Sequence, residues 1–333
     1  MEEKTTKKYF SGLLLKIAIG LTAAVGCQLL AGVVIATFFP QVLENPTLTI
    51  LAGMLPLYLI GYPVYYLLVR TTPVSMEIPK KKMKVWQVLL AAVLSFGIMY
   101  IANTLGTIIV NIISAILNRN VGNVLNNMAT SGGNLIIMII IMVFAAPICE
   151  EIIFRKLIID RTVAYGEGVA ILLSATIFAL FHGNVAQMVY AFPIGLLFGF
   201  IYVRTGNIKY SMTLHVIINA LGTGLPIIML KFIDINEFTQ IAASGDLSAI
   251  MAYEMEHLVG IMLLVCQEVL VFGSMAASIV IFIIALVKKK FFLVKRETDL
   301  PKGKRFVTVA CNIGMLIIVI VTGALTIYQL FAM

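Results

Sequence analysis

The sequence predicts an all-α polytopic membrane protein, a bundle of about eight to nine transmembrane helices that encloses a polar site within the membrane. Of its 333 residues, 61% are hydrophobic and only 12% are charged, whereas charged residues make up about 25% of a soluble globular protein. Apolar segments recur along the whole chain, and most reach the roughly 17–25 residues that cross a hydrocarbon core. One of them contains two adjacent carboxylates, Glu150 and Glu151, after a long run without any ionisable group.

The apolar segments divide the chain into three parts. Residues 1–133 hold the first three expected helices, residues 134–224 hold a core that carries the polar motifs, and residues 225–333 hold a long outer loop and the C-terminal helices. The fifth and sixth segments are separated only by the short polar stretch from His182 to Asn184. We therefore expect nine spans, at residues 10–40, 47–69, 85–118, 134–162, 166–183, 184–205, 208–231, 257–287 and 306–332.

The basic residues predict how the chain is oriented. The formal net charge is +8, and the basic residues lie in short runs between apolar segments. This pattern is typical of loops that face anionic lipid headgroups, so it does not indicate a nucleic-acid partner. With a cytoplasmic N-terminus, most of the 24 Lys and Arg residues fall on the cytoplasmic side, as the positive-inside rule requires. We therefore expect a multi-pass protein of the cell membrane, with its N-terminus in the cytoplasm and the lipid bilayer as its surroundings.

The two adjacent carboxylates are expected to have different roles. A charge at the centre of a bilayer costs between about 2.5 and about 17 kcal/mol, so each needs a partner or a function. Arg155 follows Glu151 by four residues, and the two can form a buried ion pair on one face of the helix. Glu150 points about 100° away around the helix and has no partner in its own segment. An unpaired carboxylate within the membrane indicates a functional site.

Three further polar side chains are expected at the depth of Glu150. His182 ends the fifth segment, and His215 and Asn219 lie one turn apart on one face of the seventh. With a rise of about 1.5 Å per residue, the depths of all four groups overlap. We expect them to converge in a cavity that opens toward the cytoplasm. A single membrane histidine is commonly a helix–helix hydrogen bond, but four polar groups in register indicate a site.

These residue types have a shared chemical logic. A carboxylate can take a proton from water and turn it into a nucleophile. Two imidazoles can bind a metal ion or stabilise a developing oxyanion, and an amide N–H can donate to that oxyanion. Pro147 lies just before Glu150 and is expected to leave the carbonyl of Val143 free, which opens room for water. The set therefore predicts a hydrolase that activates water within the bilayer.

On these residues the chain resembles the CPBP intramembrane proteases, also called the Abi or CAAX-protease family, whose eukaryotic members trim prenylated proteins. The resemblance covers roughly residues 134–224. Three motifs carry it: Glu-Glu-x-x-x-Arg at 150–155, Phe-x-x-x-His at 178–182 and His-x-x-x-Asn at 215–219. Further positions that follow the family's spacing are Phe192, Gly195, Gly199, Tyr202 and Thr205-Gly206-Asn207. Lys156 departs from the glycine that many members have after the arginine, which puts the local packing in question more than the chemistry.

The resemblance implies an endopeptidase that hydrolyses a peptide bond of a membrane-associated peptide or protein. Glu150 is similar to the family's water-activating glutamate, and Glu151 and Arg155 match the pair that supports it. His182, His215 and Asn219 match the groups that stabilise the oxyanion or hold a metal. A zinc ion bound by Glu150, His182 and His215 is the alternative to a metal-free site. Because Glu150 as a zinc ligand is no longer a free base, we expect that no cofactor is required.

Two other classes of function also fit isolated polar groups within a membrane. A scaffold or immunity protein would bind a peptide without cutting it, and complete polar motifs argue against this reading. A proton-coupled transporter would also place acidic and histidine side chains at this depth. Transporters commonly show internal repeats with paired broken helices, and the sequence shows no convincing repeat. The peptidase is therefore the preferred hypothesis.

Overall fold

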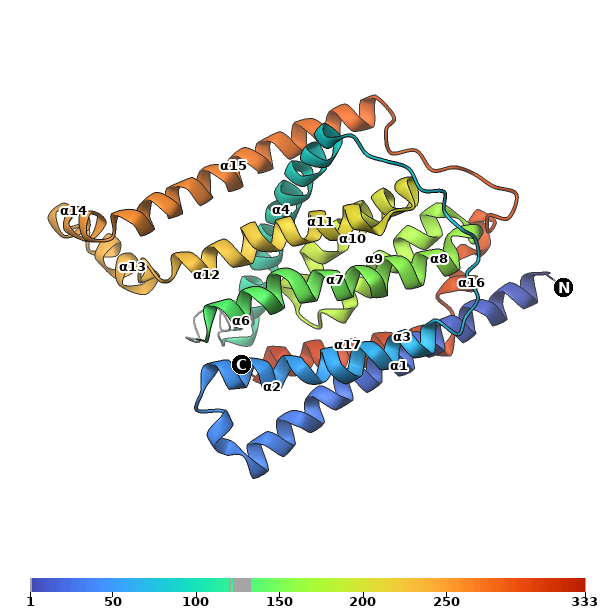
Figure 1. Cartoon of the computed structure of the whole chain (residues 1–333), viewed down its shortest axis with the longest axis horizontal. Coiled ribbons are helices and arrows are strands. Elements are labelled where there is room, and N and C mark those ends of the chain that lie inside the picture. The colour runs from blue at the N-terminus through green and yellow to red at the C-terminus, as the bar shows by residue number, and fades with distance from the viewer. Residues whose placement is uncertain (1, 120, 122–132, 333) are drawn as a thin grey trace.

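The computed structural model describes residues 2–119, 121 and 133–332, and within these ranges the chain is a bundle of helices without a strand (Figure 1). In this described part, eight helical segments are long and apolar enough to cross a membrane. They are Lys4–Phe38, Pro46–Val69, Val85–Leu117, Leu135–Tyr165, Val185–Thr205, Ile208–Met229, Leu258–Val287 and Ile313–Phe331. The chain is therefore a multi-pass membrane protein, as its composition predicted.

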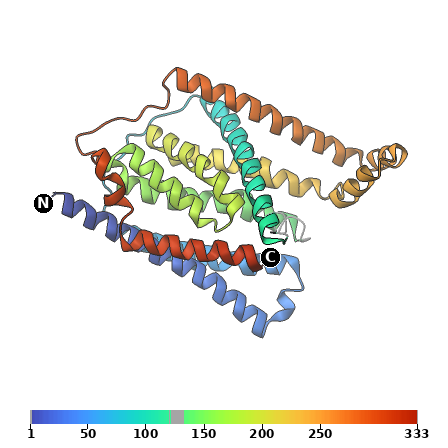
Figure 2. The same ribbon diagram turned by 180° about the vertical axis from the view of Figure 1, so that it is seen from behind.

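The expected fifth span is shorter than predicted. α9 runs over Glu167–Phe181, and its 15 residues cover only about 22 Å at 1.5 Å per residue, less than the ~30 Å of a hydrocarbon core. The chain turns at His182, and α10 (Val185–Thr205) returns toward the end where α9 began. The prediction of nine full spans is thus corrected to eight spans and one short helix. The α9–α10 turn ends well inside the bundle, short of the end where the C-terminus lies (Figure 2).

Three of the spans are interrupted near their centres by wide, π-helical turns. The span that carries the two glutamates consists of α6 (Leu135–Ile139), a wide turn at Ile140–Ala145, α7 (Ala146–Glu150), a second wide turn at Glu151–Ile159 and α8 (Asp160–Thr162). The histidine span consists of α11 (Ile208–Asn219), a wide turn at Ala220–Gly224 and α12 (Leu225–Met229). The second span joins α2 (Pro46–Pro56) to α3 (Tyr62–Val69) through Leu57–Gly61. Such turns leave backbone groups without their usual partners and often mark functional sites.

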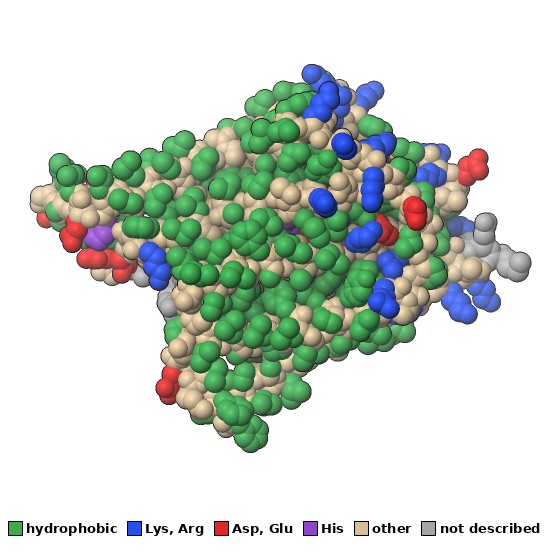
Figure 3. Space-filling view, viewed as in Figure 1, with side chains coloured by type: hydrophobic (Ala, Val, Ile, Leu, Met, Phe, Trp, Pro, Cys, Tyr) green, Lys and Arg blue, Asp and Glu red, His purple; other side chains and the backbone are tan. Residues whose placement is uncertain are grey.

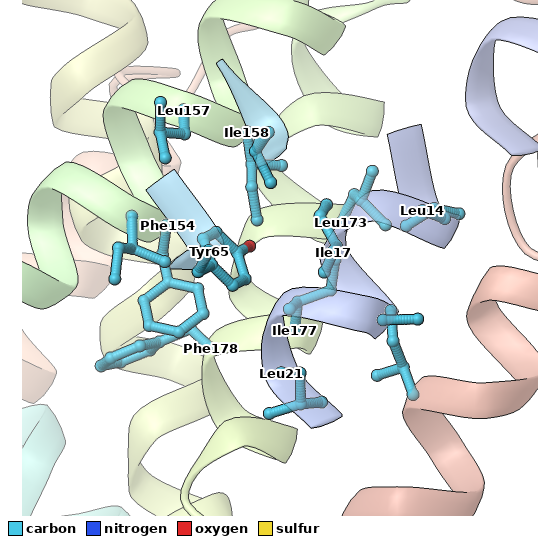
Figure 4. Close-up of a cluster of buried hydrophobic side chains, with 14 of the residues drawn as sticks. Leu14, Ile17, Leu21, Tyr65, Phe154, Leu157, Ile158, Leu173, Ile177 and Phe178 are labelled. Atoms are coloured by element: carbon cyan, nitrogen blue, oxygen red, sulfur yellow. The ribbon is translucent and has the colours of Figure 1, made fainter. Parts of the chain in front are cut away.

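The remaining helices enclose this broken centre. α1 (Glu2–Phe38) packs against α3 and against α17 (Ile313–Ala332), while α4 (Val85–Leu117) packs against α10 and α15 (Leu258–Val287). α13 (Ile235–Ser244) and α14 (Leu247–Glu256) form a hairpin at the end away from the N-terminus, and α16 (Arg305–Val309) lies at the same end as the N-terminus (Figure 1). A cluster of buried apolar side chains joins α1, α3 and α9 to the glutamate span (Figure 4).

The surface shows how the bundle sits in a membrane. Apolar side chains cover most of the face seen in Figure 3, and Lys and Arg gather at the end that holds the N-terminus. The loops 70–84 and 288–305 lie at that same end, and both are rich in Lys and Arg. We call it the basic end, and we call the end with α13, α14 and the C-terminus the opposite end. The positive-inside rule predicts that the basic end faces the cytoplasm.

The contact between α4 and α15 depends on a glycine. A Cβ added at Gly97 would lie 2.2 Å from the backbone oxygen of Ser274 and 2.5 Å from the hydroxyl of Ser278. Small residues permit such close helix crossings in membranes. We predict that Gly97→Ala lowers the amount of folded protein and its melting temperature, because the backbone of α15 must move. Gly273→Ala in α15 is the matched control, since nothing lies within 4 Å of its added Cβ, and equal melting of the two variants would contradict the prediction.

Candidate active site

The four predicted site residues line one cavity of about 470 Å³ at the centre of the bundle. Glu150 ends α7, His182 follows α9, and both His215 and Asn219 come from α11. The expected convergence of these groups is therefore observed. The volume lies within the range of about 300–1,000 Å³ that is typical of ligand sites. Glu150 is only 14% exposed and His215 only 6%, so both face an environment that is largely shielded from bulk solvent.

The second carboxylate, Glu151, is completely buried together with Arg155. The Arg155 guanidinium lies 3.3 Å from Glu151 Oε1, and neither side chain is exposed. The guanidinium also stacks over the ring of Phe178, with its carbon 4.3 Å from the ring centroid, and lies 5.8 Å from that of Phe198. A cation–π contact of this kind offsets part of the cost of burying the charge. The predicted ion pair is thus present, and it is packed between aromatic rings from α9 and α10.

Glu151 also holds His215. His215 Nδ1 lies 3.0 Å from Glu151 Oε1, and because a carboxylate can only accept, the proton of this hydrogen bond sits on Nδ1. The ring is thereby turned so that its other nitrogen, Nε2, lies 3.6 Å from Glu150 Oε2. This distance is too long for a direct hydrogen bond, and such a separation is where a bridging water is expected. Glu151 therefore orients the histidine, while the sequence had indicated only its pairing with Arg155.

His182 is oriented in the same sense. Its Nδ1 lies 2.8 Å from the backbone oxygen of Phe178, and because a carbonyl can only accept, Nδ1 must donate. The ring packs edge-on against Phe178, with centroids 4.9 Å apart. Both histidines are therefore fixed through Nδ1, which leaves Nε2 of each ring for chemistry in the cavity. A second group that sets the tautomer in this way is a common feature of functional histidines.

Asn219 supplies a hydrogen bond that the backbone of Pro147 cannot make. Asn219 Nδ2 donates to the backbone oxygen of Met142 at 2.9 Å. Met142 lies in the wide turn at Ile140–Ala145, whose bonds run from one residue to the fifth after it. The fifth residue after Met142 is Pro147, which has no N–H. The released carbonyl is thus that of Met142 and not the expected Val143, because the helix is wider here than a regular α-helix.

Residues from the flanking spans complete the cavity, and no sequence motif had pointed to them. Tyr58 and Tyr62 come from the second span, Tyr190 comes from α10, and neutral polar side chains come from α1, α4 and α17. The latter are Gln28, Asn103 and Gln329. Single tyrosines and glutamines in apolar spans give no periodic signal, so only their tertiary placement reveals that they face the site.

The zinc alternative requires three ligands around one point. Such a site uses three protein ligands, and among the residues that the structure describes no group of three His, Cys, Asp or Glu side chains is placed to hold a metal ion. His215 Nε2 lies 3.6 Å from Glu150 Oε2, while the Nδ1 bond of His182 to its own helix leaves Nε2 of that ring in the cavity.

The direction of the cavity differs from the sequence-based expectation. Beyond the polar centre, its lining continues along the halves of the helices that lead to the opposite end. Examples are Met54 in the first half of the second span, Ile141 near the start of the glutamate span and Pro226 in α12. The residues that line it include none from the loops of the basic end. The lining thus leads away from the basic end, which the sequence assigns to the cytoplasm, and that assignment stays a prediction. Buried apolar side chains such as Leu14, Leu157 and Leu173 pack together in the bundle (Figure 4).

Comparison with known proteins identifies the segment that holds the site. Residues 132–221 match the family described as type II CAAX prenyl endopeptidase Rce1-like. This segment contains all three motifs on which the resemblance to the CPBP proteases rests. A putative membrane peptidase of Bacillus subtilis (strain 168), YdiL, is 33% identical over 87 residues, which cover 25% of this chain and 34% of that protein. The match thus spans about a third of the curated relative. No solved structure matches the chain.

The buried ion pair leads to a prediction about folding. Arg155→Ala leaves Glu151 buried without its cation, which costs about 3–5 kcal/mol for a pair of this kind. We expect less folded protein in the membrane, a lower melting temperature and a loss of any activity that depends on His215. Lys156→Ala is the control, because Lys156 is 56% exposed and its partner Asp160 also accepts from Tyr202, so its loss leaves no buried charge without a partner. Unchanged abundance and melting of Arg155→Ala would show that Arg155 acts in the chemistry instead.

Proposed function

We propose that the protein is an intramembrane endopeptidase in which Glu150 activates water to hydrolyse a peptide bond. The observation that carries this proposal is the pairing of Glu150 with His215 in one cavity, with Glu151 holding the histidine from behind. A carboxylate and an oriented imidazole at the floor of a shielded cavity are the elements of general acid–base catalysis. The family match and the putative peptidase relative support the same class of reaction.

The proposed reaction begins with water between Glu150 and the substrate carbonyl. Glu150 takes a proton from this water as its oxygen attacks the carbonyl carbon, and the carbonyl oxygen becomes an oxyanion. Glu150 then returns the proton to the amide nitrogen, the C–N bond breaks, and an acid and an amine leave. The cavity favours this sequence because it excludes most of the bulk water that would otherwise weaken each electrostatic contact.

The oxyanion requires hydrogen-bond donors at the same place. Asn219 uses one N–H of its amide on Met142, and the second N–H remains for the substrate. His182 and His215 are both fixed through Nδ1, so each offers Nε2, which donates when the ring is protonated. Loss of one such donor in other hydrolases costs about 10²–10³ in rate. We assign His182, His215 and Asn219 to this role, with Glu151 and Arg155 as positioning residues.

The position of the site defines the chemical class of the proposed substrate. A site within the bundle takes a peptide or a membrane-protein segment that is already associated with the bilayer. The matching family is that of prenyl endopeptidases, but nothing in the cavity of this chain requires a prenyl group. A scaffold that binds such a peptide without cutting it is the competing function, and the following variant separates the two.

We predict that Glu150→Gln abolishes hydrolysis while the protein folds and inserts normally. The change keeps the size of the side chain but removes the base, and loss of general-base catalysis lowers the rate by about 10²- to 10⁴-fold. Turnover is measured on purified protein with a panel of membrane-tethered peptides, and product is detected by mass spectrometry. Glu268→Gln is the control, because this carboxylate lies in α15 and does not line the cavity.

Two outcomes would contradict the assignment of Glu150. Turnover of Glu150→Gln above a tenth of the wild-type rate would remove it as the base. Binding of a peptide by both proteins with turnover by neither would favour the scaffold. Equal melting temperatures of the two variants are needed in either case, because they show that the difference lies in chemistry and not in folding.

A separate prediction concerns metal ions. We expect activity to persist after dialysis against a chelator, since the described residues do not gather three ligands around one point. Metal content is measured in parallel by elemental analysis of the dialysed protein. Loss of activity on chelation, restored by stoichiometric zinc, would instead assign His182, His215 and Glu150 as ligands.

A further inference from the structure

The cavity extends in only one direction from the catalytic centre. Glu150 lies at the middle of its span, and the lining on α11 and α12 runs from His215 outward to Ile227, near the end of α12. On α10 the lining residues all come from its first half, and on α17 they come from its last turns. All of these positions lead toward the opposite end, where α13 and α14 are found (Figure 1).

The short helix α9 explains why space exists on that side. α9 ends at Phe181, and the turn at Gly183 packs against Leu325 of α17. A Cβ added to Gly183 would lie 2.4 Å from Leu325 Cδ2, and the backbone there has a φ of +60° that favours glycine. Beyond this turn neither α9 nor α10 contributes residues, so the neighbouring helices surround a hollow instead of a packed core.

At the basic end, side chains hydrogen-bond to one another and to backbone carbonyl groups and so hold the helix ends together. Arg161 donates to the carbonyl oxygens of Val69, Leu157 and Arg70 at 3.0–3.2 Å. This fixes the end of α3 against the end of the glutamate span. Tyr202 of α10 donates to Asp160 at 2.6 Å, which binds a third helix to the same point. Arg161 and Asp160 are almost completely buried, so the three helix ends pack closely around them.

The second basic loop is fixed over the same end by Glu167. This carboxylate is 3% exposed and pairs with Arg204 of α10 and Arg296 of the loop. It also accepts from the backbone N–H of Val294 at 2.8 Å. A buried carboxylate with three donors is a stable anchor. Residues 288–305 are therefore held as a cover on α9 and α10, which closes the route from the basic end to the catalytic centre.

The walls of the cavity also restrict what it can hold. Glu150 is the only Asp, Glu, Lys or Arg among the lining residues, and the other polar groups besides the two histidines are neutral amides and hydroxyls. An acidic residue of a substrate would find no cation there, a basic one would find only the proposed base Glu150, and burial of an unpaired charge is costly. Met54, Met99 and Met142 are flexible apolar side chains that can adapt to different shapes.

Resting on the proposed function, we infer that the peptidase receives an uncharged, largely apolar peptide segment from the side of the membrane opposite the basic loops. With the basic end in the cytoplasm, this is the outer side, so the substrate class is an exported peptide or the outer part of a membrane-spanning segment. Cytoplasmic tails do not reach Glu150 by this route, because Arg161 and Glu167 hold that end closed.

The experiment measures access to the cavity from each side of the membrane. Single cysteines are placed in a background without Cys27, Cys149, Cys266 and Cys311, in sealed vesicles of known orientation. Thr223→Cys reports on the outer part of the cavity, Lys80→Cys marks the basic loops, and Glu256→Cys marks α14. The probe is a small hydrophilic maleimide that does not cross membranes.

We expect Thr223→Cys to react from the side on which Glu256→Cys reacts, at least about tenfold faster than from the Lys80 side, because only a water-filled path admits the reagent. Val269→Cys is the control for depth, since Val269 lies near the middle of α15 and is 67% exposed on its apolar surface. Reaction of Thr223→Cys chiefly from the Lys80 side, or no faster than that of Val269→Cys, would overturn the inference.

The same variants keep this inference separate from the proposed function. Labelling is repeated with Glu150→Gln added, because access does not depend on turnover and should be unchanged. If labelling comes from the Lys80 side while Glu150→Gln abolishes hydrolysis, the route is wrong and the peptidase stands. If labelling follows the prediction while Glu150→Gln retains full turnover, the route stands and the assignment of Glu150 falls.

Discussion

The site depends on one buried carboxylate, that of Glu151, which serves two partners at once. Arg155 neutralises its charge on one side. On the other side, the carboxylate accepts a hydrogen bond from His215 and thereby orients that ring. A carboxylate at this depth is stable only with a cation near it, and His215 presents Nε2 to Glu150 only while its Nδ1 is held. The cost of burying an ion pair is thereby linked to the placement of the proposed catalytic group. The rings of Phe178 and Phe198 bind this unit to α9 and α10, so four helices meet around one charge.

A second constraint is the irregular backbone at the centre of the bundle. Free carbonyl groups within a membrane must find donors, because no lipid group can supply them. The structure meets this requirement with side chains: Asn219 donates to Met142, and Ser174 donates to the carbonyl of Phe154 at 2.8 Å. Asn219 therefore stabilises a broken helix and is also one of the proposed oxyanion donors. A substitution at Asn219 is therefore expected to affect both the helix and the oxyanion, whereas Glu150 has no such structural duty.

The asymmetry of the bundle gives the site its direction. At the basic end, long polar loops are fixed to the helix ends by Arg161 and Glu167, and the apolar core beneath them is densely packed. At the other end, the shortness of α9 leaves a hollow lined by neutral side chains. Water needed for hydrolysis and a peptide substrate would share this one path. In the proposed orientation and function, the same asymmetry would separate Glu150 from soluble proteins of the cytoplasm.

The sequence by itself determined the membrane class, the approximate spans, the Glu151–Arg155 pair and the set of polar residues that meet in the cavity, because each of these follows from local composition or from helical spacing. Only the tertiary structure decided that α9 stops short, that Glu151 orients His215, and that the released carbonyl belongs to Met142. It also decided that tyrosines and amides of the flanking spans line the site and that the cavity leads away from the basic loops. These features depend on which helices pack against one another and at what height, and hydrophobic periodicity carries no record of contacts between segments far apart in the chain.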